Sequence, residues 1–507
     1  MKACVISAAG RFAQHYGAFR ESYFTVFYKD NVLKRNIDAA ERFGEQVKKF
    51  ESAKRLIIMG LSVIGLLLMT AVYAYMWFHV YYTPVRLRLK FYFNGHALVL
   101  LIYFVLLSFF SSTYGGTKVG YLKASDVFFS QTFSLLAVNV ISYFQISLMA
   151  NWLVAVPPMI EMTLLQLAIA GVWTYLSNRL YYRLYPPRKL LLVHGERDVA
   201  DIMTKFESRK DKYVVKETIS IAKGMETISQ KAVSGAYDAV VLWDIPAKDR
   251  NKLMKYCYAH SVRIYFMPKI TDVLVKGAEQ LNLFDTPIFL IREYELTVEQ
   301  RFVKRCIDLV CSLLLLVIAS PFMLLTALAV KLYDGGPVLY KQIRCTRGER
   351  QFYILKFRSM RVDAEKDGVA RLSSKNDDRI TPVGKMIRKI RLDELPQLMN
   401  ILKGDMSFIG PRPERPEIIE QYKEDMPEFV YRMKVKAGLA GYAQVYGKYN
   451  TTPYDKLKLD LTYIENYTVW LDIKLMLLTL KILFVPESTE GIDEGQTTAM
   501  KDSTKKK

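Results

Sequence analysis

The sequence predicts three kinds of structure in order along the chain: an α-helical membrane bundle with four spans, a Rossmann-like α/β middle domain, and a mixed α/β, mostly helical third domain with a further membrane element. Hydrophobic residues make up 51% of the 507 residues although 24% are charged, so the apolar residues must be clustered. Long apolar runs come first, and shorter runs separated by polar stretches follow. The expected segments are 1–55 (cytoplasmic N-terminal segment), 56–185 (bundle), 186–295 (middle domain), 300–486 (third domain) and 487–507 (disordered tail).

Four early stretches are apolar enough to cross a bilayer, which takes roughly 20 apolar residues per helix. Lysines and arginines before the first stretch, between the second and third, and after the fourth favour a cytoplasmic location for both ends of the bundle. Arg86, Arg88 and Lys90 conflict with this topology because they would lie in the first outer loop. The four stretches are residues 56–79, 96–112, 127–149 and 157–182.

The formal net charge of +21 has two readings, nucleic-acid binding or attraction to an anionic membrane and a phosphate-rich substrate. The apolar stretches favour the second reading, so no nucleic-acid partner is expected. The five cysteines show neither metal-ligand spacing nor a disulfide framework, which is typical of a reducing compartment.

The middle segment alternates short apolar runs with amphipathic stretches, a pattern typical of a doubly wound parallel sheet. Its only trace of a dinucleotide fingerprint is a single glycine, Gly195, so a spacer or dimerisation module is favoured over a nucleotide site. The predicted strands are 190–193, 239–243, 262–267 and 287–291, and the predicted helices are 199–208, 219–234 and 248–260.

The third domain carries adjacent carboxylates, Asp393 and Glu394, between strongly cationic segments. Such a carboxylate can hold a metal or attack phosphorus, because an idle anion would repel a phosphate ligand. Pro396 predicts that the pair lies at a helix N-terminus, and an ordinary helix cap is the alternative reading. The upstream cations are Lys341, Arg344, Arg347, Arg350, Lys356, Arg358 and Arg361.

A further apolar stretch, residues 307–330, contains Ser320 and Pro321 near its middle. Proline removes a backbone donor and predicts a kink, whose freed backbone groups Ser320 is placed to satisfy. The helix either crosses the membrane with a kink or turns back into the same leaflet. A shorter apolar stretch, 472–485, suits either a helix in the membrane interface or an ordinary packed helix.

Four motifs in the third domain together resemble a known family. They are KFRSM at 356–360, R-x-x-x-LDELPQL-x-N at 388–400, G-DMSF-x-GPRP at 404–413 and GYAQV at 441–445. The segment from about residue 301 to 486 resembles the bacterial sugar transferases called polyprenyl-phosphate hexose-1-phosphate transferases, the monotopic phosphoglycosyl transferases. With its apolar N-terminal half, the chain is similar to the large undecaprenyl-phosphate glucose or galactose phosphotransferases.

The resemblance implies a reaction: transfer of hexose 1-phosphate from a UDP-sugar to undecaprenyl phosphate, giving undecaprenyl-diphosphate-sugar and UMP. This would be the first step of capsule, exopolysaccharide or O-antigen synthesis. Asp393 would form a phosphosugar-aspartyl intermediate, and Glu394 would help bind Mg²⁺. The expected location is the bacterial cytoplasmic membrane with the catalytic domain on the cytoplasmic face, and a homodimer is a possible assembly.

The same resemblance assigns further residues. Pro321 with Ser320 would make the stretch 307–330 a re-entrant membrane helix. The chain differs from the commonest family pattern in four places that bear on sugar or uracil recognition: Ser359, Arg391, Ala437 with Ala440, and Lys448. The expected substrate-binding residues are Lys356, Arg358, Arg388, Pro411, Arg412, Pro413, Gln444, Lys448 and Asp460.

Two alternatives remain open at the level of sequence. A membrane-bound nucleotide-sugar dehydratase or epimerase needs a glycine-rich turn, which is absent, and a tyrosine-lysine pair on a helix. Tyr454 and Lys458 have the spacing of such a pair but lie far from the middle domain in the sequence. A non-catalytic scaffold for polysaccharide assembly would not need the cationic carboxylate site.

Overall fold

The computed structural model describes residues 53–86, 92–291, 296–362, 364, 377–447 and 451–482. The predicted N-terminal segment to residue 52, Arg88, Lys90, Lys448 and the predicted tail lie outside these residues. The chain divides between Pro186 and Pro187 into two compact units, which are described separately below.

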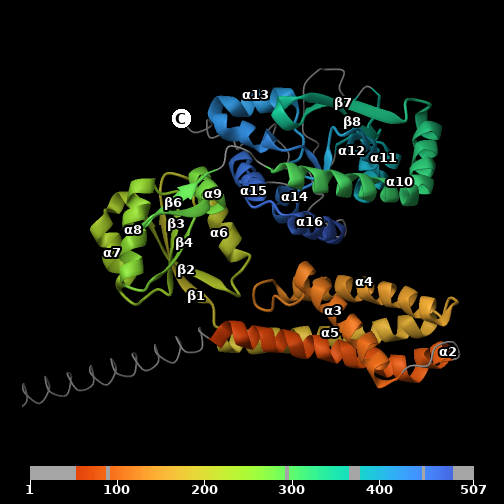
Figure 1. The fold of residues 1–507 in the computed structure, drawn as a ribbon. Coiled ribbons are helices and arrows are strands. Elements are labelled where there is room, and N and C mark those ends of the chain that lie inside the picture. Colours follow the sequence, from red (N-terminus) through yellow and green to blue (C-terminus); the bar gives the residue numbers. More distant parts are fainter. Residues whose placement is uncertain are drawn as a thin grey trace, which may run out of the picture. The chain divides into compact units, whose positions relative to one another are not determined.

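The first unit is a bundle of long helices (Figure 1). Each of the four predicted apolar stretches is helical, and many of its large apolar side chains face outward. Including α10 of the second unit, five helices in the described part of the chain are long and apolar enough to cross a membrane. The helices of this unit are Ala53–Tyr81, which ends in the π-turn η1 (Trp77–Tyr81), then α2 (Tyr82–Arg86), α3 (Phe93–Tyr114), α4 (Ala124–Ala150) and α5 (Pro157–Leu184).

A cluster of neutral polar side chains lies inside this bundle. The Asn139 amide donates to Gln166 Oε1 and to Thr163 Oγ1, both at 2.8 Å, and Tyr103 donates to Asn139 Oδ1 at 2.9 Å. Gln166 donates to the Tyr103 hydroxyl at 2.8 Å and to the carbonyl of Met69 at 3.0 Å. The amide groups of Asn139 and Gln166 are thereby fully hydrogen-bonded, so the cluster joins four helices without leaving a free polar atom on either amide.

The second unit begins with a four-stranded parallel sheet of order β2-β1-β3-β4, as the doubly wound prediction requires. Helix α6 packs against one face, and helices α7 and α8 pack against the other (Figure 1). The central strand β3 is buried along its whole length, which explains its uninterrupted apolar sequence. The elements are β1 (Arg188–His194), α6 (Ala200–Glu207), β2 (Tyr213–Ser220), α7 (Met225–Val233), β3 (Ala239–Trp243), α8 (Ala247–Ala259), β4 (Arg263–Phe266) and α9 (Ile270–Gly277).

Two sequence predictions in this domain need correction, one in the start of a helix and one in the pairing of a strand: α7 is present but begins only at Met225. The predicted helix 219–234 begins inside β2, an edge strand that carries the polar residues Lys216 and Glu217 and therefore lacks the apolar run of a buried strand. The predicted parallel strand 287–291 is instead β6 (Thr286–Leu290), which pairs antiparallel with β5 (Glu279–Leu283) in a separate two-stranded hairpin.

Gly195 follows β1 at a place where two backbones nearly touch. A Cβ atom there would lie 2.1 Å from the carbonyl oxygen of Asp244, so only glycine fits between β1 and β3. The neighbouring Arg197 stacks on Trp243 and lies 3.5 Å from Asp455 of α15. This edge of the sheet therefore contacts the third domain.

Helix α10 (Val298–Asp334) opens the third domain with a capping box on Thr297, and Figure 1 shows it sharply bent. Pro321 lies inside it and has no N–H for the carbonyl of Val317, four residues earlier. The Ser320 hydroxyl donates to that carbonyl at 2.8 Å. The serine therefore satisfies the acceptor that the proline leaves free.

The rest of the third domain is mostly helical around two small two-stranded sheets. Helix α16 is packed, since Asp472, Leu475 and Leu478 are buried. The elements are β7 (Leu339–Cys345), β8 (Gln351–Phe357), α11 (Pro382–Lys389), the 3-10 turn η4 (Leu392–Glu394), α12 (Gln397–Lys403), β9 (Ser407–Ile409), α13 (Pro416–Asp425), η5 (Pro427–Lys434), β10 (Gly438–Ala440), α14 (Tyr442–Tyr446), α15 (Pro453–Glu465) and α16 (Val469–Ile482).

The main hydrophobic core of this domain lies between α13, η5, α15 and α16. It also contains Ile270 and Val273 of α9, which belongs to the middle domain by sequence. This core thus joins the two predicted domains, which agrees with their single compact unit.

Candidate functional site

The adjacent carboxylates lie in a tight turn between α11 and α12. Helix α11 ends after Lys389, and Arg391 adopts a left-handed conformation with φ 58°. The 3-10 turn η4 then carries Asp393 and Glu394, and Pro396 caps α12. The pair therefore precedes the helix, as predicted, but lies in its own short turn.

Glu394 is held by three cations. Lys356 of β8 and Arg412 each lie 3.0 Å from its Oε1, and Arg391 lies 3.8 Å from its Oε2. Burial opposes ionisation of this carboxyl, but Lys356, Arg412 and Arg391 outweigh burial and lower its pKa well below the usual range. Glu394 is therefore a permanent anion at neutral pH.

Asp393 has the opposite character. Its side chain is buried, and its Oδ1 accepts no hydrogen bond from the residues that the structure describes. Burial and the neighbouring charge of Glu394 raise its pKa to about 6, although Lys356, Arg388 and Arg391 lower it. The pair thus combines a carboxylate fixed by cations with one that is desolvated and has a free oxygen atom.

The loop that carries Arg412 is fixed through its backbone carbonyls. Arg432 Nη2 donates to the carbonyl of Arg412 at 3.0 Å, and Arg344 Nη1 donates to that of Pro413 at 3.2 Å. The N–H of Gly438 donates to the carbonyl of Pro411 at 2.9 Å. Because two residues of this loop are prolines without N–H groups, its hydrogen bonds depend on donors from outside the loop.

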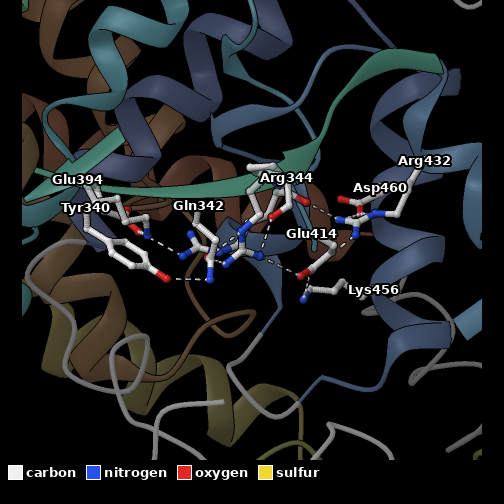
Figure 2. A network of polar contacts seen from close by, with 11 residues as sticks. Tyr340, Gln342, Arg344, Glu394, Glu414, Arg432, Lys456 and Asp460 are labelled. Atoms are coloured by element: carbon white, nitrogen blue, oxygen red, sulfur yellow. Dashed lines mark hydrogen bonds and ion pairs between the residues drawn. The ribbon is translucent and has the colours of Figure 1, made fainter. Parts of the chain in front are cut away.

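A buried charge cluster supplies two of those donors (Figure 2). Arg432 forms a fork on Asp460, with Nε at 2.9 Å and Nη2 at 2.8 Å from Oδ2, and both side chains are almost fully buried. Glu414 lies 3.1 Å from Lys456, 3.5 Å from Arg432 and 3.8 Å from Arg344. Asp460, an expected substrate-binding residue, is therefore an ion-pair partner of Arg432 in this structure.

Alternate residues of β7 continue the network away from the cluster. Arg344 Nη2 donates to Gln342 Oε1 at 2.6 Å, and Gln342 Nε2 donates to the Tyr340 hydroxyl at 3.0 Å. Figure 2 shows these side chains in a row along the strand, as the two-residue period of a strand requires. Cations of the basic segment 341–361 are thus held in fixed positions.

The structure brings some, but not all, of the predicted site residues together. Lys356, Asp393, Glu394 and Arg412 meet, and the charge of Arg388 acts on Asp393. Arg358 is instead buried and forms a fork on Asp334 at the end of α10, with Nη1 2.7 Å from Oδ2.

Other predicted residues have their own surroundings. Pro411 and Pro413 line a small pocket together with Arg412, Glu414 and Arg432. Gln444 donates to the carbonyl of Leu439 at 3.2 Å, and its Oε1 is buried without a partner among the described residues.

Sequence reasoning gave no individual role to Arg344, Glu414, Arg432 or Lys456. Glu414 directly follows the GPRP motif, and an acidic residue beside this cationic loop could have indicated an ion pair. Arg432 lies 28 residues from its partner Asp460, and no local pattern links the two.

Comparison with known proteins agrees with this site. The family model described as bacterial sugar transferase matches residues 299–486. An Aeromonas hydrophila protein named UDP-N-acetylgalactosamine-undecaprenyl-phosphate N-acetylgalactosaminephosphotransferase is 36% identical over 253 residues, which cover 49% of this chain and 59% of that protein. The undecaprenyl-phosphate galactose phosphotransferase of Salmonella typhimurium is 34% identical over 279 residues, covering 48% and 58%.

A third relative is shorter. The UDP-glucose:undecaprenyl-phosphate glucose-1-phosphate transferase of Caulobacter vibrioides is 38% identical over 190 residues, which cover 36% of this chain and 71% of that protein. The chain spans about half the length of the other relatives. With the family match across the whole third domain, this coverage shows that the chain belongs to the bacterial sugar transferase family.

Proposed function

We propose that this protein transfers a hexose 1-phosphate from a UDP-sugar to undecaprenyl phosphate. Family membership and the activities named for its relatives support the reaction class. The observation that carries the proposal is the pairing of a desolvated carboxylate, Asp393, with a carboxylate that three cations hold, Glu394. A dehydratase or a scaffold has no use for that pairing.

In the first half-reaction, Asp393 Oδ1 attacks the β-phosphorus of the UDP-sugar. A bond forms between that oxygen and phosphorus, the bond from phosphorus to the bridging oxygen breaks, and UMP leaves with the electron pair. In the second half-reaction, a phosphate oxygen of undecaprenyl phosphate attacks the same phosphorus and displaces the Asp393 carboxylate. The product is undecaprenyl-diphosphate-sugar, and the aspartate is regenerated.

The surrounding cations stabilise the charge that moves in this exchange. Lys356 and Arg412 are fixed by Glu394, and Arg412 is also fixed through its backbone by Arg432. Cations held in place in this way do not have to reorganise when charge develops on the leaving phosphate. Burial keeps Asp393 weakly solvated, which leaves its free oxygen available to phosphorus.

The two carboxylates also suit Mg²⁺. This ion usually takes one or two protein carboxylates and completes its coordination with water and substrate phosphates. Asp393 Oδ1 has no hydrogen bond among the described residues, and the contact from Arg391 Nη1 to Glu394 Oε2 is long, at 3.8 Å. When bound, Mg²⁺ would neutralise part of the diphosphate charge, with Glu394 as its main protein ligand.

The remaining expectations form part of the same proposal. Glucose 1-phosphate or galactose 1-phosphate is the expected cargo, and the bacterial cytoplasmic membrane is the expected location. The bend of α10 (Figure 1) and the proline inside this helix support a re-entrant α10 that returns to the cytoplasmic leaflet, where nucleotide sugars are present. In intact cells, labelling of Cys345, which follows α10 in the chain, by an impermeant thiol reagent would contradict this topology.

The test is UMP release from a panel of UDP-sugars by the detergent-purified protein, with Mg²⁺ and undecaprenyl phosphate. We expect release with one preferred sugar, and a loss of at least about 1,000-fold in Asp393→Asn and of about 100-fold in Glu394→Gln. Lys389→Asn, an exposed change on the same helix connection, serves as the matched control. Folded protein that releases no UMP from any donor would contradict the proposal.

A further inference from the structure

Arg391 occupies an unusual backbone position beside the carboxylates. Its φ of 58° and ψ of 19° lie in the left-handed region, which residues other than glycine, asparagine and aspartate rarely adopt. Its carbonyl accepts the N–H of Glu394 at 3.3 Å, so this conformation starts the turn that carries both acids. A large cationic side chain stands here although the backbone conformation favours glycine, which indicates a functional role for that side chain.

The side chain contacts a different oxygen from the other two cations. Lys356 and Arg412 both lie 3.0 Å from Glu394 Oε1, whereas Arg391 Nη1 lies 3.8 Å from Oε2. A contact of 3.8 Å is an ion pair without a hydrogen bond, so it is the weakest of the three. The side chain of Arg391 is also 30% exposed. The contact between Arg391 and Glu394 is therefore the most easily broken of the three contacts.

The charges around this point favour an additional anion. Lys356, Arg391 and Arg412 surround Glu394, and both acids together carry fewer charges than these three cations with Arg388. A diphosphate brings two negative charges. An arginine fork suits two phosphate oxygens better than a single carboxylate oxygen at a distance.

We infer that Arg391 is a substrate-binding residue that exchanges partners: it faces Glu394 in the free enzyme and binds the diphosphate of the nucleotide-sugar donor. This inference rests on the proposed function. The exchange frees Glu394 Oε2 when the donor enters, so donor binding and release of that oxygen occur together. The family motif at 388–400 leaves position 391 unspecified, and Arg391 differs from the commonest residue type there.

The experiment compares Arg391→Asn with Arg391→Lys. Asparagine tolerates the left-handed backbone but removes the charge, whereas lysine keeps the charge and loses the fork. For Arg391→Asn we expect the KM for the UDP-sugar to rise about tenfold, the scale of one charge-assisted contact, with kcat within about twofold. Arg391→Lys should recover part of the loss. The matched control is Lys389→Asn. Lys389 is exposed and lies two residues before Arg391, so this variant removes one positive charge nearby without touching Glu394.

A binding measurement separates this role from folding. In an Asp393→Asn background, which cannot turn over, the donor's Kd is measured by calorimetry with and without Arg391→Asn. A tenfold weaker Kd supports the inference. The inference is overturned if Arg391→Asn changes neither the Kd for the donor in the Asp393→Asn background nor the KM for the donor in the active enzyme. It is also overturned if only the KM for undecaprenyl phosphate changes. Absence of UMP release in the wild-type protein would instead be a failure of the proposed function.

Discussion

Two buried polar clusters in this molecule differ in a way that separates structure from function. In the membrane bundle, Tyr103, Asn139 and Gln166 are neutral, and the two amides use all of their donors and acceptors. In the transferase site, Asp393 keeps a buried oxygen without a partner, and Glu394 attracts more cations than it can neutralise. A saturated cluster fixes helices to one another, whereas an unsaturated and charged cluster retains capacity for a ligand.

The largest expected effect tests the buried ion pair that supports the charged cluster. Arg432→Gln leaves Asp460 buried without its cation, and we expect a loss of about 3–5 kcal/mol in the free energy of unfolding. Thermal denaturation of the detergent-purified protein measures it. Glu420→Gln is the control, because Glu420 pairs with Lys423 at the exposed surface and should contribute less than about 0.5 kcal/mol. Equal shifts in both variants would show that the buried pair does not support the site.

The pH dependence of the first half-reaction tests whether the unsaturated carboxylate reacts. Burial and Glu394 raise the pKa of Asp393 to about 6, and only its ionised form can attack phosphorus. The rate of UMP release should therefore be constant above about pH 7 and fall about tenfold per unit below pH 6. Glu394 stays ionised over this range because the pKa of that carboxyl is lowered. A rate that is constant down to pH 4.5 would exclude Asp393 as the nucleophile.

The same raised pKa predicts that the ionised side chain of Asp393 destabilises the fold. An aspartate of pKa about 6 in the folded state and ~3.9 in the unfolded state costs stability above pH 6 and costs nothing below about pH 4. Asp393→Asn should therefore raise the free energy of unfolding by about 1–3 kcal/mol at pH 7.5, with the gain absent at pH 4. Thermal denaturation at the two pH values measures this difference. A destabilised variant at pH 7.5 would show that the charge is already compensated.

The smallest expected effect concerns the saturated cluster. Asn139→Leu removes several hydrogen bonds at once but leaves partners that can re-pair with one another, so we expect a loss of about 1–2 kcal/mol in stability. UMP release per folded molecule should not change. If the activity of Asn139→Leu per folded molecule fell more than about threefold while that of Lys389→Asn was unchanged, the bundle cluster would affect the chemistry.

The sequence predicts an element of the fold correctly where its apolar residues form a continuous run or line one face. The apolar stretches and the buried strand β3 are examples, because burial on all sides forces an unbroken apolar run. The apolar pattern does not predict strand β2, because this strand lies at the edge of the sheet and carries the polar residues Lys216 and Glu217. The hairpin of β5 and β6 was misassigned because apolar residues in a short run do not reveal the direction of pairing.

The site was predictable only where its chemistry is local in sequence. Asp393, Glu394, Lys356 and Arg412 lie in motifs, and the structure brings them together. The partners of Arg358 and Asp460 lie elsewhere in the chain, so their pairing with Asp334 and Arg432 could not be read from neighbouring residues. The desolvation of Asp393 likewise depends on packing and has no signature in the sequence.

Helix α15 has a consequence for the construction of hybrid enzymes. Its Lys456 and Asp460 reach Glu414 and Arg432, while Lys458 donates to the carbonyl of Pro268 in the middle domain at 3.3 Å. The junction between the two domains is therefore a helix face and not a linker. A chimera that exchanges the middle domain between relatives must exchange that face as well, or it will separate the loop that carries Arg412 from the residues that hold it.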